Sequence, residues 1–236
     1  MIQFVAYASG SCGNLYTVDD GRTRLMIECG LPWKQLREAL EFRTSEIAGI
    51  LLTHHHMDHA KGARDAAKAG LDVYTSQATL DALGLSGHRF HAVEHGRRFA
   101  ICSWTIQPFR SVHEGEQDGD TLGFILRNRA GEKMLFLTDT CYCPFRFNGL
   151  SVIAIECNYA ADILAESVRA GQVTRSLQKR IRSSHMSLET AKEFFRANDL
   201  SQVREIWLLH LSDSNSDAER FKREIQETTG KIVRIA

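Results

Sequence analysis

The chain has 236 residues, enough for one large domain or two small ones and for a substantial hydrophobic core. Its composition, with 43% hydrophobic and 25% charged residues, is ordinary for a globular protein and excludes a disordered or collagen-like chain. Lys plus Arg and Asp plus Glu each number 29, so the formal net charge of zero does not favour a polyanionic partner, and any contact with nucleic acid must be local.

Neither a secretory leader nor an apolar run near the roughly 20 residues of a membrane helix is visible. The six cysteines form no paired framework, and Cys141-x-Cys143 lacks the two-residue gap of a zinc ribbon. We therefore interpret them as reduced, mostly buried residues of a cytoplasmic protein.

The N-terminal part of the chain is predicted to consist of strands joined by tight turns. Strands are expected over residues 1–8, through Val18, and up to Glu28, with a tight loop at 9–14 and a hairpin turn at 19–21. Residues 32–42 and 58–70 are predicted to be helices, the first with Pro32 near its first turn.

The rest of the chain mixes strands and helices. Residues 71–110 predict short strands with one short helix, and residues 122–138 predict a hairpin. From Ser151 the predicted order is strand, helix, helix, strand, helix, strand, with clear helices at 187–198 and 214–229 and a final strand at 231–235. Two sheets with helices outside them are the economical arrangement.

Five short apolar runs each stop at a polar residue suited to metal or proton chemistry: Glu28, His54, Asp139, Glu156 and His210. Continuous apolar runs of this length are typical of strands buried on both faces. Ligands at strand ends are where α/β proteins place their sites. The five ends are therefore predicted to converge on one cleft.

The most specific motif is H-x-H-x-D-H, formed by His54, His56, Asp58 and His59. In H-x-H both imidazoles leave the same side of an extended segment and can bind one ion. Asp58 and His59, at a helix start, are placed to face a second ion. His55 then points elsewhere and is left out of the site.

Three further ligands complete a two-metal site. His113 is the natural third imidazole, Asp139 the natural bridge between the ions, and His210 the natural last ligand of the second ion. The alternative interpretation of each is a satisfied polar residue at a strand end.

This constellation resembles the metallo-β-lactamase superfamily along essentially the whole chain, and within it the single-domain YycJ-like (WalJ) exonuclease family. The matching segments are residues 8–14, 53–59, 137–140, 155–158, 184–187 and 210–212, with Asn215 behind them. The resemblance implies one domain over residues 1–236: an α/β, four-layered αβ/βα sandwich with two mixed sheets and helices outside. It also implies two divalent ions, Zn²⁺ or Mn²⁺.

Glu156, His185 and His210 also resemble the three nuclease motifs that ribonuclease J and other β-CASP enzymes add to this fold. The large β-CASP insertion is absent, because only about 30 residues separate Glu156 from His185. The resemblance places Glu156 and His185 among the catalytic residues and Asn158 at the substrate.

Three positions depart from the family pattern. Glu28 stands where Asp is usual, Cys141 where Gly is usual, and Tyr159 where close members have His. Glu28 is longer by one methylene, which makes its role in orienting a metal ligand less secure. Tyr159 removes one outer donor and puts details of the substrate in doubt.

Two divalent ions that share a water lower its pKa toward neutrality and neutralise charge developing on the attacked centre. Asp58 would ligate a metal and orient the resulting metal-bridging hydroxide. The Glu156–His185 pair could protonate a leaving oxygen or hold a phosphate. An acyl hydrolase has less need of this pair, so the sequence favours phosphoryl chemistry.

Basic residues crowd the segment before His185, and Arg175, Lys179 and Arg182 would share one face of a helix. They predict a local track for backbone phosphates, although a solvated charged face is an equal alternative. The loop at 9–14, with Ser11 and Asn14, could present N–H groups to phosphate or be only a tight turn.

The predicted function is a binuclear-metal-dependent phosphodiesterase or nuclease acting on single-stranded nucleic acid or DNA ends. The 5′→3′ exonuclease direction is implied by the resemblance alone. The alternatives are a small-molecule hydrolase of a cyclic phosphodiester, lactone or thioester, and a catalytically silent binding module. An oxygen-reducing di-iron protein is disfavoured, because His56 stands where a carboxylate would be expected.

Overall fold

Each of the five apolar runs that end in a polar residue forms a β-strand in the computed structural model, which describes residues 1–111 and 121–236. The described strands form two mixed sheets, of six and seven strands, accompanied by helices, which confirms the predicted α/β class. The chain divides into two compact units. Unit 1 holds the described residues of 1–110 and 121–132, and unit 2 holds residues 133–236 with Ser111.

The six-stranded sheet belongs to unit 1 and has the order β1-β2-β3-β4-β5-β6. Its first three strands are antiparallel, whereas β3 to β6 are parallel. Residues that follow β3 and β4 therefore emerge at the same edge of the sheet. The strands are β1 (Gln3–Ala8), β2 (Leu15–Asp19), β3 (Arg24–Ile27), β4 (Ile47–Leu51), β5 (Val73–Thr75) and β6 (Phe90–Ala92).

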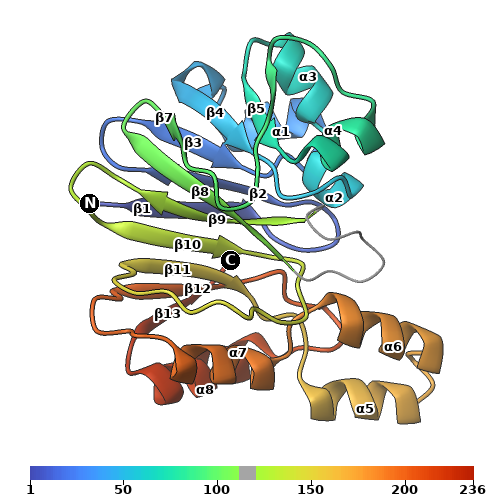
Figure 1. Ribbon diagram of the computed structural model, residues 1–236. Coiled ribbons are helices and arrows are strands. Elements are labelled where there is room, and N and C mark those ends of the chain that lie inside the picture. Colours follow the sequence, from blue (N-terminus) through green and yellow to red (C-terminus); the bar gives the residue numbers. More distant parts are fainter. Residues whose placement is uncertain (112–120) are drawn as a thin grey trace. The chain divides into compact units, whose positions relative to one another are not determined.

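Helices of unit 1 pack against this sheet (Figure 1). The buried core joins Leu36, Ala66 and Leu80 from three helices to Met26 and Ile50 from the strands. The helices are α1 (Trp33–Ala39), α2 (Met57–Ala60), α3 (Ala63–Lys68) and α4 (Gln77–Leu83), with a 3₁₀ turn η1 (Thr44–Glu46).

The helix predicted over residues 58–70 is instead two short helices, α2 and α3. The carbonyl of Asp58 accepts a hydrogen bond from the Asn14 backbone N–H at 2.7 Å. The N–H of Gly62, which would have bonded that carbonyl in a continuous helix, donates to the carbonyl of Cys29 at 2.8 Å. Tertiary hydrogen bonds therefore replace the helical one and interrupt the helix.

Unit 1 also contains three antiparallel strands, in the order β7-β8-β9. The indole N–H of Trp104, which is buried, donates to the carbonyl of Thr23 at 2.9 Å and ties these strands to the rest of the unit. The strands are β7 (Phe99–Ile101), β8 (Trp104–Arg110) and β9 (Leu122–Arg127).

Unit 2 is built on four parallel strands in the order β10-β11-β12-β13. The positions of β10 and β11 are almost entirely buried, as their continuous apolar sequences predict, whereas the outer strand β13 is partly exposed. Because the strands are parallel, the residues that end β10, β11 and β12 lie at one edge of the sheet. The strands are β10 (Lys133–Leu137), β11 (Val152–Glu156), β12 (Glu205–Leu209) and β13 (Ile232–Ile235).

Three helices, rather than the two predicted, separate β11 from β12. Thr174, Ser187 and Asp217 each accept a hydrogen bond from a backbone N–H in the first turn of the helix they precede. Helices α7 and α8 pack together, whereas α5 and α6 form a hairpin (Figure 1). The helices are α5 (Ala161–Arg169), α6 (Arg175–Ser184), α7 (Leu188–Ala197) and α8 (Ala218–Thr229). Within the described ranges, every helix is too short or too polar to cross a membrane.

Candidate metal and catalytic site

Unit 1 gathers the four side chains of the H-x-H-x-D-H motif at the end of β4 and in α2. The ring of His54 lies 4.6 Å from that of His56 and 4.3 Å from that of His59. The Oδ2 atom of Asp58 lies 3.4 Å from Nε2 of His59. His54 and His59 are buried, and the His55 ring lies 6.3 Å from that of His54. The motif therefore forms a compact set of imidazole and carboxylate groups.

Glu28 follows β3, the parallel neighbour of β4, and is fully buried. Its Oε2 atom accepts a hydrogen bond from the Thr53 backbone N–H, and its Oε1 atom lies 3.4 Å from Nδ1 of His59. A carboxylate behind an imidazole fixes the ring and increases its basicity as a metal ligand. In this chain the Glu28 carboxylate lies within ion-pair distance of His59, and its role in orienting that ring stays a prediction.

Thr53 is a positioning residue that sequence reasoning missed. Its hydroxyl lies 2.9 Å from Nδ1 of His54, so it holds the far side of that ring. Its place directly before the first His of the motif, at a strand end, is the signal that could have identified it.

Asn14 is fully buried, and its side chain is used within the fold. Its Nδ2 atom lies 3.2 Å from both the Asp58 carbonyl and Nε2 of His59, and its Oδ1 atom accepts hydrogen bonds from Gly10 N–H and the Tyr16 hydroxyl. Ser11, in the same loop, is exposed. These contacts place Asn14 behind Asp58 and His59, whereas Ser11 faces solvent.

Gly30 allows three segments of unit 1 to meet. Its N–H donates to the Asn14 carbonyl at 2.9 Å, and the neighbouring Cys29 N–H donates to the His59 carbonyl at 2.8 Å. A Cβ atom at position 30 would overlap the backbone of Asp58. Only glycine fits, so the backbone position of Asp58 depends on Gly30.

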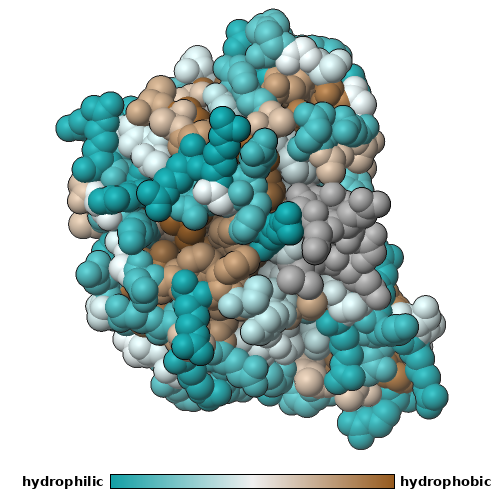
Figure 2. Space-filling model, viewed as in Figure 1, coloured by the Kyte–Doolittle hydropathy of each residue, from teal (hydrophilic) through white to brown (hydrophobic). Residues whose placement is uncertain are grey.

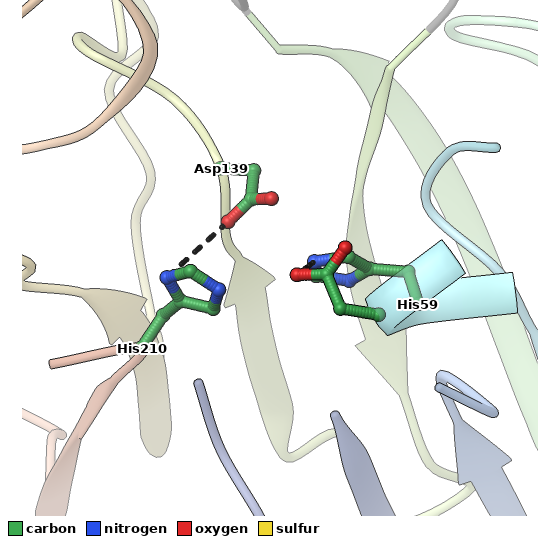
Figure 3. A group of neighbouring side chains, drawn as sticks. His59, Asp139 and His210 are labelled. Atoms are coloured by element: carbon green, nitrogen blue, oxygen red, sulfur yellow. Dashed lines mark ion pairs between the residues drawn. The ribbon is translucent and has the colours of Figure 1, made fainter. Parts of the chain in front are cut away.

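Unit 2 brings four further ligand-type side chains together. Asp139, Glu156 and His210 lie at the ends of β10, β11 and β12, and His185 precedes α7. One ligand atom from each of the four lies within 4.8 Å of the others. Figure 3 shows His210 turned toward Asp139, with Nδ1 and Oδ1 3.7 Å apart. The convergence predicted for these strand ends is present in unit 2.

Glu156 is fully buried and accepts three hydrogen bonds. Its Oε2 atom accepts from the backbone N–H groups of Thr140 and Met186, each at 3.0 Å, and its Oε1 atom lies 2.7 Å from Nδ1 of His185. The carboxylate therefore holds a proton on Nδ1 and leaves Nε2 of His185 for another partner. The His185 side chain is 21% exposed and so is accessible to a ligand.

Asn158 has a role in unit 2 like that of Asn14 in unit 1. Its Nδ2 atom donates to the His210 carbonyl at 2.7 Å and lies 3.1 Å from Nδ1 of the same residue. Asn158 is buried, so these contacts fix the ring and backbone of His210.

The basic segment before His185 is helical, as α6. Arg175, Lys179 and Arg182 lie on one exposed face of it and line a shallow hollow of about 330 Å³ with Gln178 and Ser183. Figure 2 shows a mostly hydrophilic surface over α5 and α6. The predicted one-sided arrangement of these cations is therefore present.

The cysteines next to the site are poor candidates for thiolate chemistry. Burial raises the pKa of the Cys29 thiol, which follows Glu28, and of the Cys157 thiol, which follows Glu156. Both groups stay protonated near neutral pH, so neither offers a thiolate as ligand or nucleophile.

His113, the predicted third imidazole, lies outside the described residues.

The donor set of each unit fits a divalent cation. Imidazole nitrogens and carboxylate oxygens suit Zn²⁺ and Mn²⁺ alike. Several of these groups are buried beside one another, where a cation would offset the cost of burying the carboxylates. The site therefore has the chemistry expected of a metal centre.

Comparison with known proteins identifies relatives of the whole chain. The family model of the beta-lactamase superfamily domain matches residues 23–211. The chain is 26% identical to exodeoxyribonuclease YycJ of Bacillus anthracis, over 96% of this chain and 88% of that protein. It is 28% identical to exodeoxyribonuclease WalJ of Streptococcus pneumoniae serotype 2, over 90% of this chain and 82% of that protein.

A solved structure shows the same fold. The metallo-beta-lactamase fold protein YhfI of Bacillus subtilis matches with a TM-score of 0.75 and 17% identity, over 100% of this chain and 96% of that chain. The predicted metallo-β-lactamase fold is thereby confirmed.

Proposed function

Because the chain belongs to the beta-lactamase superfamily, a family of metal-dependent hydrolases, we propose that it is a phosphodiesterase that removes nucleotides from DNA ends in the 5′→3′ direction. The relatives named exodeoxyribonucleases support the substrate class. The observation that carries the proposal is the Glu156–His185 pair, joined at 2.7 Å beside Asp139 and His210.

The metal ligands would come from both units. The family match runs through residues of each unit, and we infer that the chain acts as one functional domain that binds two divalent ions. Bound ions would lower the pKa of a water molecule and neutralise charge on the phosphate. The proposed ligands are His54, His56, Asp58, His59, His113, Asp139 and His210.

The catalytic work of the chain falls to Asp58 and His185. The Asp58 side chain is 25% exposed, and its backbone carbonyl accepts a hydrogen bond from the Asn14 side chain. Its carboxylate would accept a hydrogen bond from the attacking water and orient it. As an imidazolium, with its Nδ1–H donated to Glu156, His185 would pass its Nε2 proton to the leaving oxygen or to a phosphate oxygen. Glu156 is a positioning residue, because it is fully buried, holds the His185 ring and accepts three hydrogen bonds from the protein.

Substrate binding would rest on backbone phosphates. The cationic face of α6, formed by Arg175, Lys179 and Arg182, offers exposed charges on an otherwise neutral chain. The exposed Ser11 would add a hydrogen bond to phosphate. The internal contacts of Asn14 and Asn158 lead us to propose that both act through the histidines they hold.

We place the protein in the cytoplasm. The six cysteines all lie among the described residues as thiols outside any disulfide, including the exposed Cys12 and Cys102, and such thiols persist in a reducing compartment.

The test is incubation of the purified protein with end-labelled single- and double-stranded oligonucleotides, with Zn²⁺, Mn²⁺ or Mg²⁺ added. The expected result is metal-dependent release of labelled mononucleotide from the 5′ end, and a loss of at least about 100-fold in the Asp58→Asn variant. Cleavage of chromogenic phosphodiesters or thioesters without attack on oligonucleotides would instead identify a small-molecule hydrolase.

A further inference from the structure

A second hollow in unit 2 lies outside the ligand set and the cationic face of α6. It has a volume of about 230 Å³ and lies between the loop that follows β10 and the helix α7. The loop contributes Tyr142, Phe145 and Arg146, and α7 with its C-cap contributes Glu193, Phe194 and Asn198. We call these six residues the aromatic groove.

One wall of the aromatic groove starts near Asp139, a proposed metal ligand, and the other near His185. Tyr142 is three residues beyond Asp139, and the N–H of Thr140 between them donates to Glu156. The other wall, α7, begins three residues after His185 (Figure 1). At about 1.5 Å rise per residue, Glu193 lies roughly 9 Å along the helix from Ser187. A strand with its phosphate at His185 would cover that distance in about three nucleotides of about 3.4 Å each.

The groove is held open by hydrogen bonds within the protein. The Thr140 hydroxyl donates to the Tyr142 carbonyl at 2.8 Å and fixes the near end of the loop. The far end is fixed where the Phe147 N–H donates to Oδ1 of Asn198 at 2.7 Å, while Nδ2 of Asn198 donates to the Phe194 carbonyl at 2.8 Å. Such a preformed surface requires little ordering when a ligand binds.

Tyr142 and Phe145 expose their rings although both are large and aromatic. Tyr142 is 55% exposed and Phe145 is 36% exposed. Exposed rings on a fixed surface are the usual platform for bases of single-stranded nucleic acid, because every base has a stacking face. Arg146 adds a guanidinium, which stacks on bases or pairs with phosphate, and Glu193 adds an acceptor for an exocyclic amino group.

The size of the groove restricts its occupant. Pockets for drug-sized ligands measure about 300 to 1,000 Å³, so a hollow of about 230 Å³ suits a single flat ring system. The presence of both Arg146 and Glu193 argues against a purely apolar ligand.

We propose that the aromatic groove binds a base of the DNA strand close to the scissile phosphate, with the base stacked on Tyr142. This inference rests on the proposed nuclease function and gives the enzyme a contact to a base as well as to phosphates. It accounts for two exposed aromatic side chains that the metal centre and the cationic face do not use.

The test compares the affinities of the metal-loaded wild type and of Tyr142→Ala for two single-stranded oligonucleotides, by fluorescence anisotropy. Both oligonucleotides carry phosphorothioate linkages that resist cleavage, and one has abasic sites in place of its terminal bases. We expect Tyr142→Ala to bind the normal oligonucleotide about tenfold more weakly, as loss of one stacked base implies. We expect both proteins to bind the abasic oligonucleotide equally. Tyr142→Phe, which keeps the ring, should bind both as the wild type does.

The matched control is Phe42→Ala, which removes a 64% exposed ring in unit 1. It should bind both oligonucleotides as the wild type does. Equal loss of affinity for both oligonucleotides in Tyr142→Ala would overturn the base contact, and so would no loss at all. If the wild type cleaves labelled DNA while either of these results is found, only the groove assignment fails. If the wild type neither binds nor cleaves DNA, the nuclease function fails with it.

Discussion

Glu28, Asp139 and His210 each follow a strand and adopt a left-handed backbone, with φ of 62°, 46° and 54°. Such a conformation costs a non-glycine residue on the order of 1 kcal/mol, and strained residues of this kind cluster at functional sites. In each case the left-handed residue is itself the carboxylate or imidazole that follows the strand. The backbone strain therefore falls on residues of the candidate site.

His185→Ala separates catalysis from metal binding. Nδ1 of His185 is hydrogen-bonded to Glu156, and His185 is not among the proposed metal ligands. The variant should therefore keep its metal content, while its turnover on DNA falls by about 10² to 10⁴-fold. Metal content is read by atomic emission and turnover with labelled oligonucleotides. A large loss of metal would make His185 a ligand and overturn its catalytic role.

Gly30→Ala tests the backbone support of Asp58. A methyl group at position 30 overlaps the Asp58 carbonyl, so the variant should lose about 1 to 3 kcal/mol of stability and also lose metal affinity. Chemical denaturation and metal titration measure the two effects. Unchanged values for both would show that the segments around Asp58 adapt without cost.

At this scale, the sequence was sufficient to locate the side chains but not their partners. The strand-end pattern and H-x-H-x-D-H predicted which residues carry metal chemistry. The sequence could not show that the Asn14 side chain contacts His59 and that the Asn158 side chain contacts His210. These contacts join residues that are 45 and 52 positions apart in the chain. Nor did the sequence identify Thr53, whose role depends on the rotation of the His54 ring.

Among the elements, the interrupted helix at 57–68 shows why local periodicity was insufficient. Its sequence is compatible with one helix, but Asn14 and Cys29 capture the hydrogen bonds that would continue it. The extra helix between β11 and β12 was missed for a different reason: α5 is a short amphipathic segment whose apolar residues pack on a small cluster around Tyr159 and Val173. Strands were predicted more securely, because a buried parallel strand needs a continuous apolar run.

The cationic face of α6 should control the salt dependence of DNA binding. Replacing Arg175, Lys179 and Arg182 with Gln should weaken binding and reduce the slope of log K against log salt by about 2 to 3, because fewer counterions are released. The control replaces Lys34, Lys68 and Arg223, exposed cations on other helices, and should keep the slope. An unchanged slope in the α6 variant would show that these three side chains do not contact the phosphates of bound DNA.

An ion-pair network joins α5, α7 and α8. A hydrogen bond from Arg220 at 2.7 Å, aided by Lys192, lowers the pKa of Glu224 below its ordinary value of 4.5. The same guanidinium lowers the pKa of Asp162. Since both folded-state pKa values are depressed, the stabilisation is complete above about pH 5 and is lost as the pH falls through them.

Arg220→Gln should therefore lower the melting temperature by about 2 °C at pH 7 and by progressively less as the pH falls below about 4.5. Thermal denaturation across this pH range measures the difference. A difference that stays constant down to pH 3 would show that Arg220 stabilises the fold by packing rather than through these carboxylates.

At the scale of the whole molecule, the ligand residues are distributed between two units that the family model spans together. Unit 1 contributes a motif that is local in sequence, whereas unit 2 contributes residues from three adjacent strand ends and from the start of α7. The α/β class and the family were predictable because they depend on buried strands and on a specific motif. The choice of DNA as substrate depends on surface groups that many folds share, and so it needs experiment.

The metal content per chain tests the central claim most directly. The protein is stripped with a chelator, reloaded with Zn²⁺ or Mn²⁺, and its bound metal is counted by mass spectrometry for the wild type, His54→Ala in unit 1 and His210→Ala in unit 2. The account predicts two ions per wild-type chain, a lower content in each variant, and loss of DNA hydrolysis in both. Full metal content in both variants, or no stoichiometric binding by the wild type, would contradict it.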